Sequence, residues 1–287
     1  MAVQNSLQRS RGNQRLGISA YLTADAVKNQ INQVVGGKDG QRFISAIVSA
    51  VNTNPALQEC TNQSILSGAL LGESLKLSPS PQLGQYYLVP FNDKNKGKVA
   101  QFQLGYKGYI QLAIRSGQYK KLNVLAIKEG ELIRFDPLNE EIEVRLIEDE
   151  EEREQANTIG YYAMFEYTNG FRKAIYWSKR KMEAHALKYS KGYQAKKGYT
   201  FWEKDFDGMA YKTMLRQLIS KWGIMSIDMA SAIDSDMAVI NEDGTKDYVD
   251  NDATVFDMEP AQEATPQQSQ TEQAVPVDAK AALFGNN

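Results

Sequence analysis

The sequence predicts an α+β protein: a twisted antiparallel sheet packed with helices, an N-terminal helical lobe and a disordered acidic C-terminal tail. Apolar residues recur with a helical period up to about residue 77, and β-rich runs separated by turn residues follow. Beyond residue 235, Asp, Glu, Gln, Pro, Thr and Ala dominate, and such a chain buries too little apolar surface to offset its ordering entropy. We therefore expect a flexible arm at 1–20, one folded core at 21–235 and a disordered tail at 236–287.

The helical part of the core is expected at 21–77. Its clearest apolar stripe has the spacing of one helix face and consists of Phe43, Ile44, Ile47, Val48 and Val51. The pair Asn54-Pro55 interrupts this pattern before it resumes, and Pro79 and Pro81 then force an extended turn. Cys60, the only cysteine, lies in an apolar helical context and is expected to be a core residue.

The part at 84–227 is expected to hold the sheet and the remaining helices. Two β-rich runs, 86–91 and 99–104, flank a polar segment and predict a hairpin with a basic loop. Further strands are expected at 119–128, 141–147, 159–167 and 171–177, and helices at 106–115, 179–189 and 206–222. Asn169-Gly170, between the last two strands, is a strong signal for a tight hairpin turn.

Charge is distributed very unevenly along the chain. The whole sequence has 33 Lys and Arg against 35 Asp and Glu, a net charge of −2. Residues 228–287 hold 13 acids and only two lysines, so residues 1–227 hold 31 basic and 22 acidic groups, a net charge of +9. A basic body followed by an acidic tail indicates an anionic partner and a separate interaction segment or internal mimic of that partner.

The segment 94–121 has the composition of a nucleic-acid contact. It contains no acid and seven basic residues, namely Lys94, Lys96, Lys98, Lys107, Arg115, Lys120 and Lys121. Four aromatic residues alternate with them, and rings offer stacking faces to bases while cations neutralise phosphates whatever the base sequence. The alternative is a solvated basic face over core aromatics. A second stretch, 170–222, repeats the pattern with 13 basic residues against four acids.

Several catalytic readings are disfavoured by the motifs. Gly36-Gly37-Lys38 and Gly97-Lys98 lack the following Ser or Thr of a phosphate-binding loop, so an ATP-driven motor is not expected. His185, the only histidine, is expected to be structural. The contiguous acids of 148–152 are expected to form a solvated loop rather than a metal-nuclease site. With no signal peptide and no apolar run of 18 residues, we expect a soluble cytoplasmic protein with no membrane contact. We also expect no cofactor.

Residues 101–113, QFQLGYKGYIQLA, followed by Arg115-Ser116-Gly117, resemble the RecT family of phage single-strand annealing proteins. Other blocks agree in order: LGQYYLVPF at 83–91, Gly160-Tyr161-Tyr162-Ala163 with Asn169-Gly170, Phe201-Trp202, Asp205-Phe206, and MAYKTMLRQL at 209–218. The resemblance covers about residues 43–227. One departure is Tyr211, where a basic residue is expected.

The resemblance implies ATP-independent, non-enzymatic annealing of complementary strands in phage homologous recombination and DNA repair. It also implies a recombinase that self-associates into rings or filaments on single-stranded DNA and annealed duplex, beside a phage exonuclease and host single-strand binding protein. The alternatives from other classes are a DNA nuclease or its DNA-binding subunit, and a passive single-strand coat.

Two groups of contact residues are expected. The resemblance places DNA contacts at Tyr106, Lys107, Arg115, Lys212 and Arg216, and the basic patterns add Lys120, Lys121, Arg172, Lys173, Lys191, Lys196 and Lys197. Lys212 and Arg216 lie about 100° from the apolar stripe of their helix and are expected to face solvent or phosphate. In the tail, Leu283 and Phe284 are a candidate docking peptide; a frayed terminus is the alternative.

Overall fold

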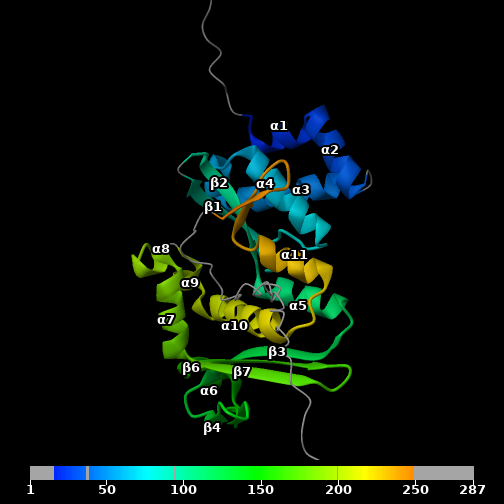
Figure 1. The fold of residues 1–287 in the computed structure, drawn as a ribbon. Coiled ribbons are helices and arrows are strands. Elements are labelled where there is room, and N and C mark those ends of the chain that lie inside the picture. Colours follow the sequence, from blue (N-terminus) through cyan, green and yellow to red (C-terminus); the bar gives the residue numbers. More distant parts are fainter. Residues whose placement is uncertain (1–15, 37–38, 94, 199, 249–287) are drawn as a thin grey trace, which may run out of the picture. The chain divides into compact units, whose positions relative to one another are not determined.

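The computed structural model describes residues 16–36, 39–93, 95–198 and 200–248, all within a compact unit that ends at Thr254. The candidate docking residues Leu283 and Phe284 lie outside these residues. The predicted α+β class is confirmed, because helices combine with antiparallel sheets throughout (Figure 1). In the part of the chain that the structure describes, no helix is both long enough and apolar enough to cross a membrane.

The N-terminal lobe is helical, as predicted. Its elements are α1 (Ile18–Thr23), α2 (Asp25–Val35), α3 (Gly40–Thr53), the 3-10 helix η1 (Pro55–Glu59) and α4 (Asn62–Ser74). The predicted break at Asn54-Pro55 separates α3 from η1. The predicted stripe of α3 faces the core, where Phe43, Ile44, Ile47 and Val51 are all buried. Cys60 is buried as well, as expected.

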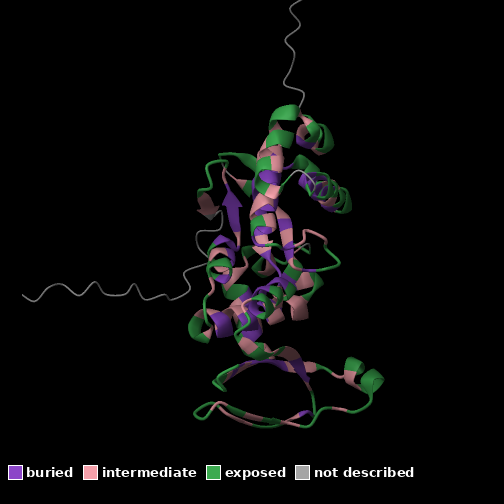
Figure 2. Cartoon of the chain, turned by 90° about the vertical axis from the view of Figure 1, so that its right-hand side faces the viewer, coloured by how far each residue is buried: buried purple, intermediate pink, exposed green. Residues whose placement is uncertain are grey.

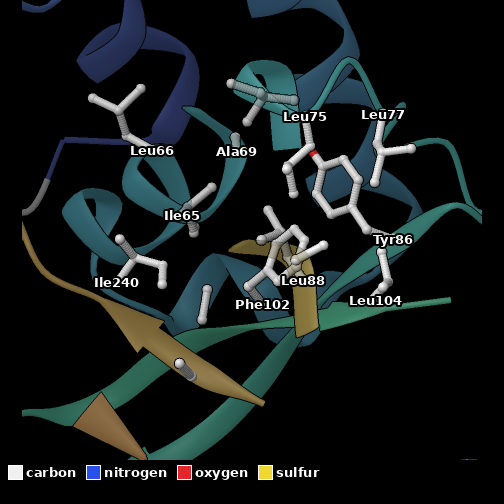
Figure 3. Packing of buried hydrophobic residues seen from close by; sticks show 14 of the residues in the cluster. Ile65, Leu66, Ala69, Leu75, Leu77, Tyr86, Leu88, Phe102, Leu104 and Ile240 are labelled. Carbon is white, nitrogen blue, oxygen red and sulfur yellow. The ribbon is translucent and has the colours of Figure 1, made fainter. Parts of the chain in front are cut away.

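A four-stranded sheet packs against α4. Its order is β1-β2-β8-β9, with bounds β1 (Tyr86–Asp93), β2 (Gly97–Leu104), β8 (Ala238–Ile240) and β9 (Lys246–Tyr248). The predicted hairpin of β1 and β2 is present, with Leu88 opposite Phe102. Figure 3 shows the side chains of α4, β1, β2 and β8 converging in one core, with Leu88 beside Phe102.

The expected start of the tail at residue 236 is wrong. β8 pairs with β2 and then with β9, and Ala238, Val239 and Ile240 are all buried. Composition averaged over a window hides this short apolar strand among its acidic neighbours, because its pairing partner lies far away in the sequence. The folded core therefore extends at least to the end of β9.

A second sheet, β3-β6-β7, lies under two helices (Figure 1). After α5 (Tyr106–Arg115), its strands are β3 (Tyr119–Lys128), β6 (Thr158–Tyr167) and β7 (Arg172–Ser178). The predicted tight turn is confirmed, with Gly170 at φ +87°. One face packs on α7 (Lys179–Tyr189) and α10 (Phe206–Trp222), burying Tyr161, Phe165 and Met214. The other face packs on the hairpin of β4 (Leu132–Asp136) and β5 (Glu141–Val144).

Several elements differ from the expectations. The predicted single sheet is three sheets, and β4 was not predicted. The acidic stretch expected to be a loop contains α6 (Glu150–Gln155), because Asp149 accepts the backbone N–H of Glu152 and caps the helix. Three other short helices were also missed, α8 (Lys191–Gln194), α9 (Phe201–Lys204) and α11 (Ile227–Ser235). Figure 2 shows buried residues mainly where helices and strands pack together, and exposed residues along the outer helices and loops.

Candidate nucleic-acid interface

The start of α5 is held by an unusually close backbone approach. A Cβ at Gly105 would lie 2.1 Å from the carbonyl oxygen of Gly84, and one at Gly108 would lie 2.1 Å from that of Gln85. The N–H of Gly105 donates to the same Gln85 carbonyl at 2.9 Å. Only glycines permit this contact, because any Cβ would force the two segments apart. The Gly-Tyr-Lys-Gly block is therefore a rigid support for the two side chains between its glycines.

Those two side chains, Tyr106 and Lys107, form a ring and cation pair. The Lys107 ammonium lies 5.9 Å from the centroid of the Tyr106 ring, within the range of a weak cation–π contact. Tyr106 is half-buried and meets the edge of the Tyr211 ring on α10 at 5.6 Å. Lys107 itself is exposed. The structure thus presents the charge of this predicted contact to solvent and fixes its neighbouring ring.

A second ring pair adjoins this group. Tyr87 of β1 and Phe201 at the start of α9 lie 5.5 Å apart between ring centroids. The Tyr87 hydroxyl and the side-chain stem of Lys107 both border Gly84, at 3.1 and 3.4 Å from the position of a Cβ there. Burial raises the pKa of Tyr87, and the charge of Asp205 and the Tyr106 hydroxyl add to this effect. Segments near residues 87, 107 and 201 therefore form one surface.

The loop that precedes Phe201 contributes two further predicted contacts. Lys196 and Lys197 are exposed, and the backbone of Lys196 is in the left-handed region at φ +49°. Glu203 ties the end of this loop to α9, accepting from the N–H of Gly198 at 2.8 Å and from Thr200. Within the described residues, no carboxylate lies within ion-pair distance of Lys107, Lys196 or Lys197. We call Tyr87, Tyr106, Lys107, Lys196, Lys197 and Phe201 the basic aromatic cluster.

A separate basic group lies on the second sheet. Lys120 and Lys121 of β3 share one carboxylate, Glu166 of β6, at 2.6 and 3.6 Å, and Glu166 also pairs across the sheet with Arg172 of β7. Hydrogen bonding from Lys120 lowers the pKa of Glu166. Three exposed cations around one acid leave a net positive charge, so these three residues remain candidate contacts.

The other three predicted contacts, Lys173, Arg115 and Lys191, differ in how far their charges are exposed. Lys173 is mostly covered, since its ammonium bonds Glu140 at 2.6 Å and lies 3.6 Å from the Trp222 ring centroid. Arg115 is exposed but donates to the Leu75 carbonyl at 2.6 Å. Lys191 is exposed on α8. In the basic loop of the first hairpin, Lys96 pairs with Asp247 and Lys98 with Glu59, so acids already neutralise part of that predicted contact.

The predicted exposure of Lys212 and Arg216 is wrong. Lys212 Nζ lies 2.9 Å from Asp236 Oδ1, and Arg216 lies 2.6 Å from Asp236 Oδ2. The side chains are 10% and 13% exposed, and that of Asp236 is fully buried. Burial lowers the pKa of Lys212. Helix periodicity placed both residues beside the apolar stripe, but the segment after α11 covers that flank and supplies their acid.

The cluster also contains residues that the sequence interpretation did not select. Tyr87 and Phe201 lie in blocks that resemble the family, but neither is among the contacts that the charge pattern or the resemblance predicts. A sequence feature could have pointed to them, since each is an aromatic residue a few positions after Gly84 or the Lys196-Lys197 pair. What could not be foreseen is that the two rings meet, because more than a hundred residues separate them. Within the described chain, no group of three or more His, Cys, Asp and Glu side chains is placed to hold a metal ion.

Comparison with known proteins gives a consistent result. The model of the RecT family matches residues 41–253. The chain is 37% identical over 289 residues to the uncharacterized protein YqaK of Bacillus subtilis, covering 97% of this chain and 94% of YqaK. It is 28% identical over 240 residues to the protein RecT of Escherichia coli, covering 80% of this chain and 86% of that protein.

Proposed function

The chain belongs to the RecT family, and we propose that it binds single-stranded DNA and anneals complementary strands without ATP, acting as a homo-oligomer. Membership of the family supports a role in single-strand annealing during recombination. The observation that carries the DNA-binding surface is the basic aromatic cluster. Its lysines are exposed and have no acidic partner in the described structure: Lys107 lies beside the Tyr106 ring, and Lys196 and Lys197 lie on the loop that leads to the Phe201 and Tyr87 ring pair.

This cluster suits the chemical task of annealing. Two strands repel each other through their phosphates, so the protein must supply cations that hold a strand whatever its sequence. Lysines on an exposed surface do this, because phosphate contacts position a strand without reading its bases. Pairing itself makes no covalent bond, so a nucleophile or a general base is not needed. Binding is therefore expected to be independent of sequence and to weaken steeply with salt.

The test compares lysine variants in a nucleotide-free annealing assay. Replacing Lys107, Lys196 and Lys197 together by Gln should weaken binding to a single-stranded oligonucleotide and slow its pairing with the complement. The slope of log affinity against log salt should fall by about 2, since each lost phosphate contact on single strands removes about 0.7. The matched control is Lys28→Gln, an exposed lysine of α2, which should leave both properties unchanged.

Three results would contradict the proposal: a requirement for ATP hydrolysis, strong preference for one base sequence, or cleavage of the strands in the presence of Mg²⁺. The last outcome would indicate the nuclease alternative. If the triple variant binds and anneals as the wild type does, the DNA surface lies elsewhere, and the group formed by Lys120, Lys121 and Arg172 becomes the next candidate.

A further inference from the structure

We propose that the rings of Phe201 and Tyr87 form a stacking surface for an unpaired base of the bound strand. The inference rests on the proposed function and adds to it a contact that recognises bases by their flat faces. The ligand class is a single-stranded nucleic acid whose bases are not already stacked inside a duplex.

Phe201 is accessible although it is fully apolar. Its exposed fraction is 39%, and Phe171 and Trp222 are the other exposed large aromatic side chains among the described Phe and Trp residues. These two have other neighbours, because the Lys173 ammonium lies over Trp222 and the ring of Phe171 stacks with Tyr167 at 5.8 Å. Phe201 contacts Tyr87 at a tilt of 40°, so the pair is not stacked face to face. Among these three described rings, Phe201 is thus the one that follows a loop with exposed lysines without an acidic partner, Lys196 and Lys197.

The position of Phe201 is fixed by its surroundings. It is the first residue of α9, and Thr200 and Glu203 form a capping box around this helix start. Tyr87 lies on β1 opposite Gln103 and is half-buried, so it gives Phe201 a rigid neighbour. A ring held in place loses little conformational entropy when a base stacks on it, and this favours binding.

The cations needed to hold the backbone lie on the segments that flank this ring pair. Lys107 borders Gly84 together with Tyr87, and Lys196 and Lys197 lie on the loop that leads into Phe201. Rings beside cations are the combination by which single-strand binding proteins hold bases and phosphates together, and each stacked base contributes about 1–3 kcal/mol. A duplex offers such a surface only its ends, so the contact discriminates in favour of unpaired bases.

The test uses Phe201→Leu, which keeps an apolar side chain and removes the ring. Affinity is measured for an oligothymidine and for an abasic strand with the same number of phosphates. We expect the variant to bind oligothymidine about 5- to 100-fold more weakly, the range that a stacked base contributes, while its affinity for the abasic strand and its salt slope stay unchanged. Phe171→Leu, which removes another exposed ring, is the matched control and should bind both strands normally.

A second measurement keeps the test valid if Phe201→Leu folds poorly. In Phe201→Trp the new indole should be quenched by oligothymidine beyond the quenching of the wild type, and the abasic strand should not quench it. Equal affinity of Phe201→Leu and wild type for oligothymidine, or an equal loss for both strands, would overturn the stacking surface. Failure of the wild type to bind any single strand would instead overturn the proposed function.

Discussion

Asp236 is the residue on which the interior charges of the molecule converge. Its carboxylate accepts from Lys212, Arg216 and the N–H of Leu104, so it joins α10, β2 and the chain after α11. Burying two cations against one carboxylate is tolerable only while that acid remains, because an unpaired buried charge is strongly unfavourable. Lys212 and Arg216 thus have a structural role in the core.

We predict that Asp236→Asn lowers the free energy of unfolding by about 3–5 kcal/mol, as loss of one partner of a buried ion pair does. Urea denaturation followed by circular dichroism measures this change. Asp234→Asn is the control, since the Asp234 side chain is 65% exposed and its ion pair with Lys246 should contribute less than about 1 kcal/mol. A similar small effect for both variants would mean that the buried network does not stabilise the core. Replacing Lys212 and Arg216 by Ala should likewise destabilise the fold.

His185 is a second residue whose environment decides its chemistry, and the sequence-based expectation that it is structural fits its surroundings. Its ring contacts Trp177, Tyr189 and Trp202. Burial lowers the pKa of His185 to about 4, and the charges of Lys188, Arg216 and Lys181 act in the same direction. In the folded protein the imidazole therefore stays neutral under conditions where it is protonated in the unfolded chain.

This difference predicts a loss of stability in mild acid. Between the unfolded pKa of about 6.5 and the folded value of about 4, the unfolded chain binds the extra proton, so stability falls as pH falls. Allowing for partial exposure of the ring, the loss from pH 7 to pH 5 should be about 1–2 kcal/mol. His185→Phe keeps an aromatic ring and should remove this part of the pH dependence. If the stabilities of wild type and His185→Phe changed in parallel with pH, His185 would not be the source of this pH dependence.

At the scale of elements, two glycines position part of the cluster: Gly105, which caps the N-terminus of α5, and Gly108 within that helix. The segment at Gly84 and Gln85 leans on the first turn of the helix, and this contact brings Tyr87 beside Lys107. The position of Tyr87 relative to Lys107 is therefore a consequence of backbone packing.

We predict that Gly108→Ala destabilises the protein by about 1–3 kcal/mol, the cost of overpacking at a close contact. A methyl group there would lie 2.1 Å from the Gln85 carbonyl oxygen, so the backbone must shift. In a helix without this contact, replacing Gly by Ala stabilises by about 1 kcal/mol. A net decrease in stability would therefore show that the contact with Gln85 is close. Thermal unfolding measures it, and DNA affinity should fall with it. Gly17→Ala, with no atom within 4 Å of the new methyl group, should cause only a small change.

At the scale of the whole molecule, the end of the folded core and the start of the acidic tail are distinct. β8 and β9 pair with each other, and Asp247 of β9 binds Lys96 in the loop between β1 and β2. Acids up to Asp247 thus belong to the fold, whereas the seven acids between Asp250 and Asp278 follow it in the sequence.

Two truncations should separate these roles. Removing 249–287 should leave the melting temperature and annealing of naked strands intact, whereas removing 241–287 should lower the melting temperature because β8 loses its partner strand. At low salt the shorter removal should also tighten DNA binding, since acids compete with phosphates for cations, and high salt should abolish this gain. Equal melting temperatures for both truncations would show that β9 adds nothing to stability.

The same two truncated proteins test whether the tail binds a partner. We propose that Leu283 and Phe284 contact the host single-strand binding protein, so the removal of 249–287 should impair annealing only on strands coated with it. Equal activity of full-length and truncated protein on coated strands would eliminate this docking role.

Local elements followed from the sequence alone. The helices at 106–115, 179–189 and 206–222 have the predicted bounds, and so does the strand at 119–128, because periodicity, caps and turn residues act between near neighbours. The family also followed from the sequence, since its motifs are long and ordered. Lys107 is predicted as a contact by the resemblance, and Lys196 and Lys197 are predicted by the basic pattern; all three stay predictions.

Only the tertiary structure decided which charges face solvent. Lys107 and Lys212 look alike in sequence, each beside a tyrosine on a helix, yet one is exposed and the other is buried against Asp236. The meeting of Tyr87 with Phe201, and of β8 with β2, are likewise contacts between distant segments. The physical reason is the same in each case: secondary structure depends on neighbours along the chain, whereas burial and ion pairing depend on which remote segment covers a given face.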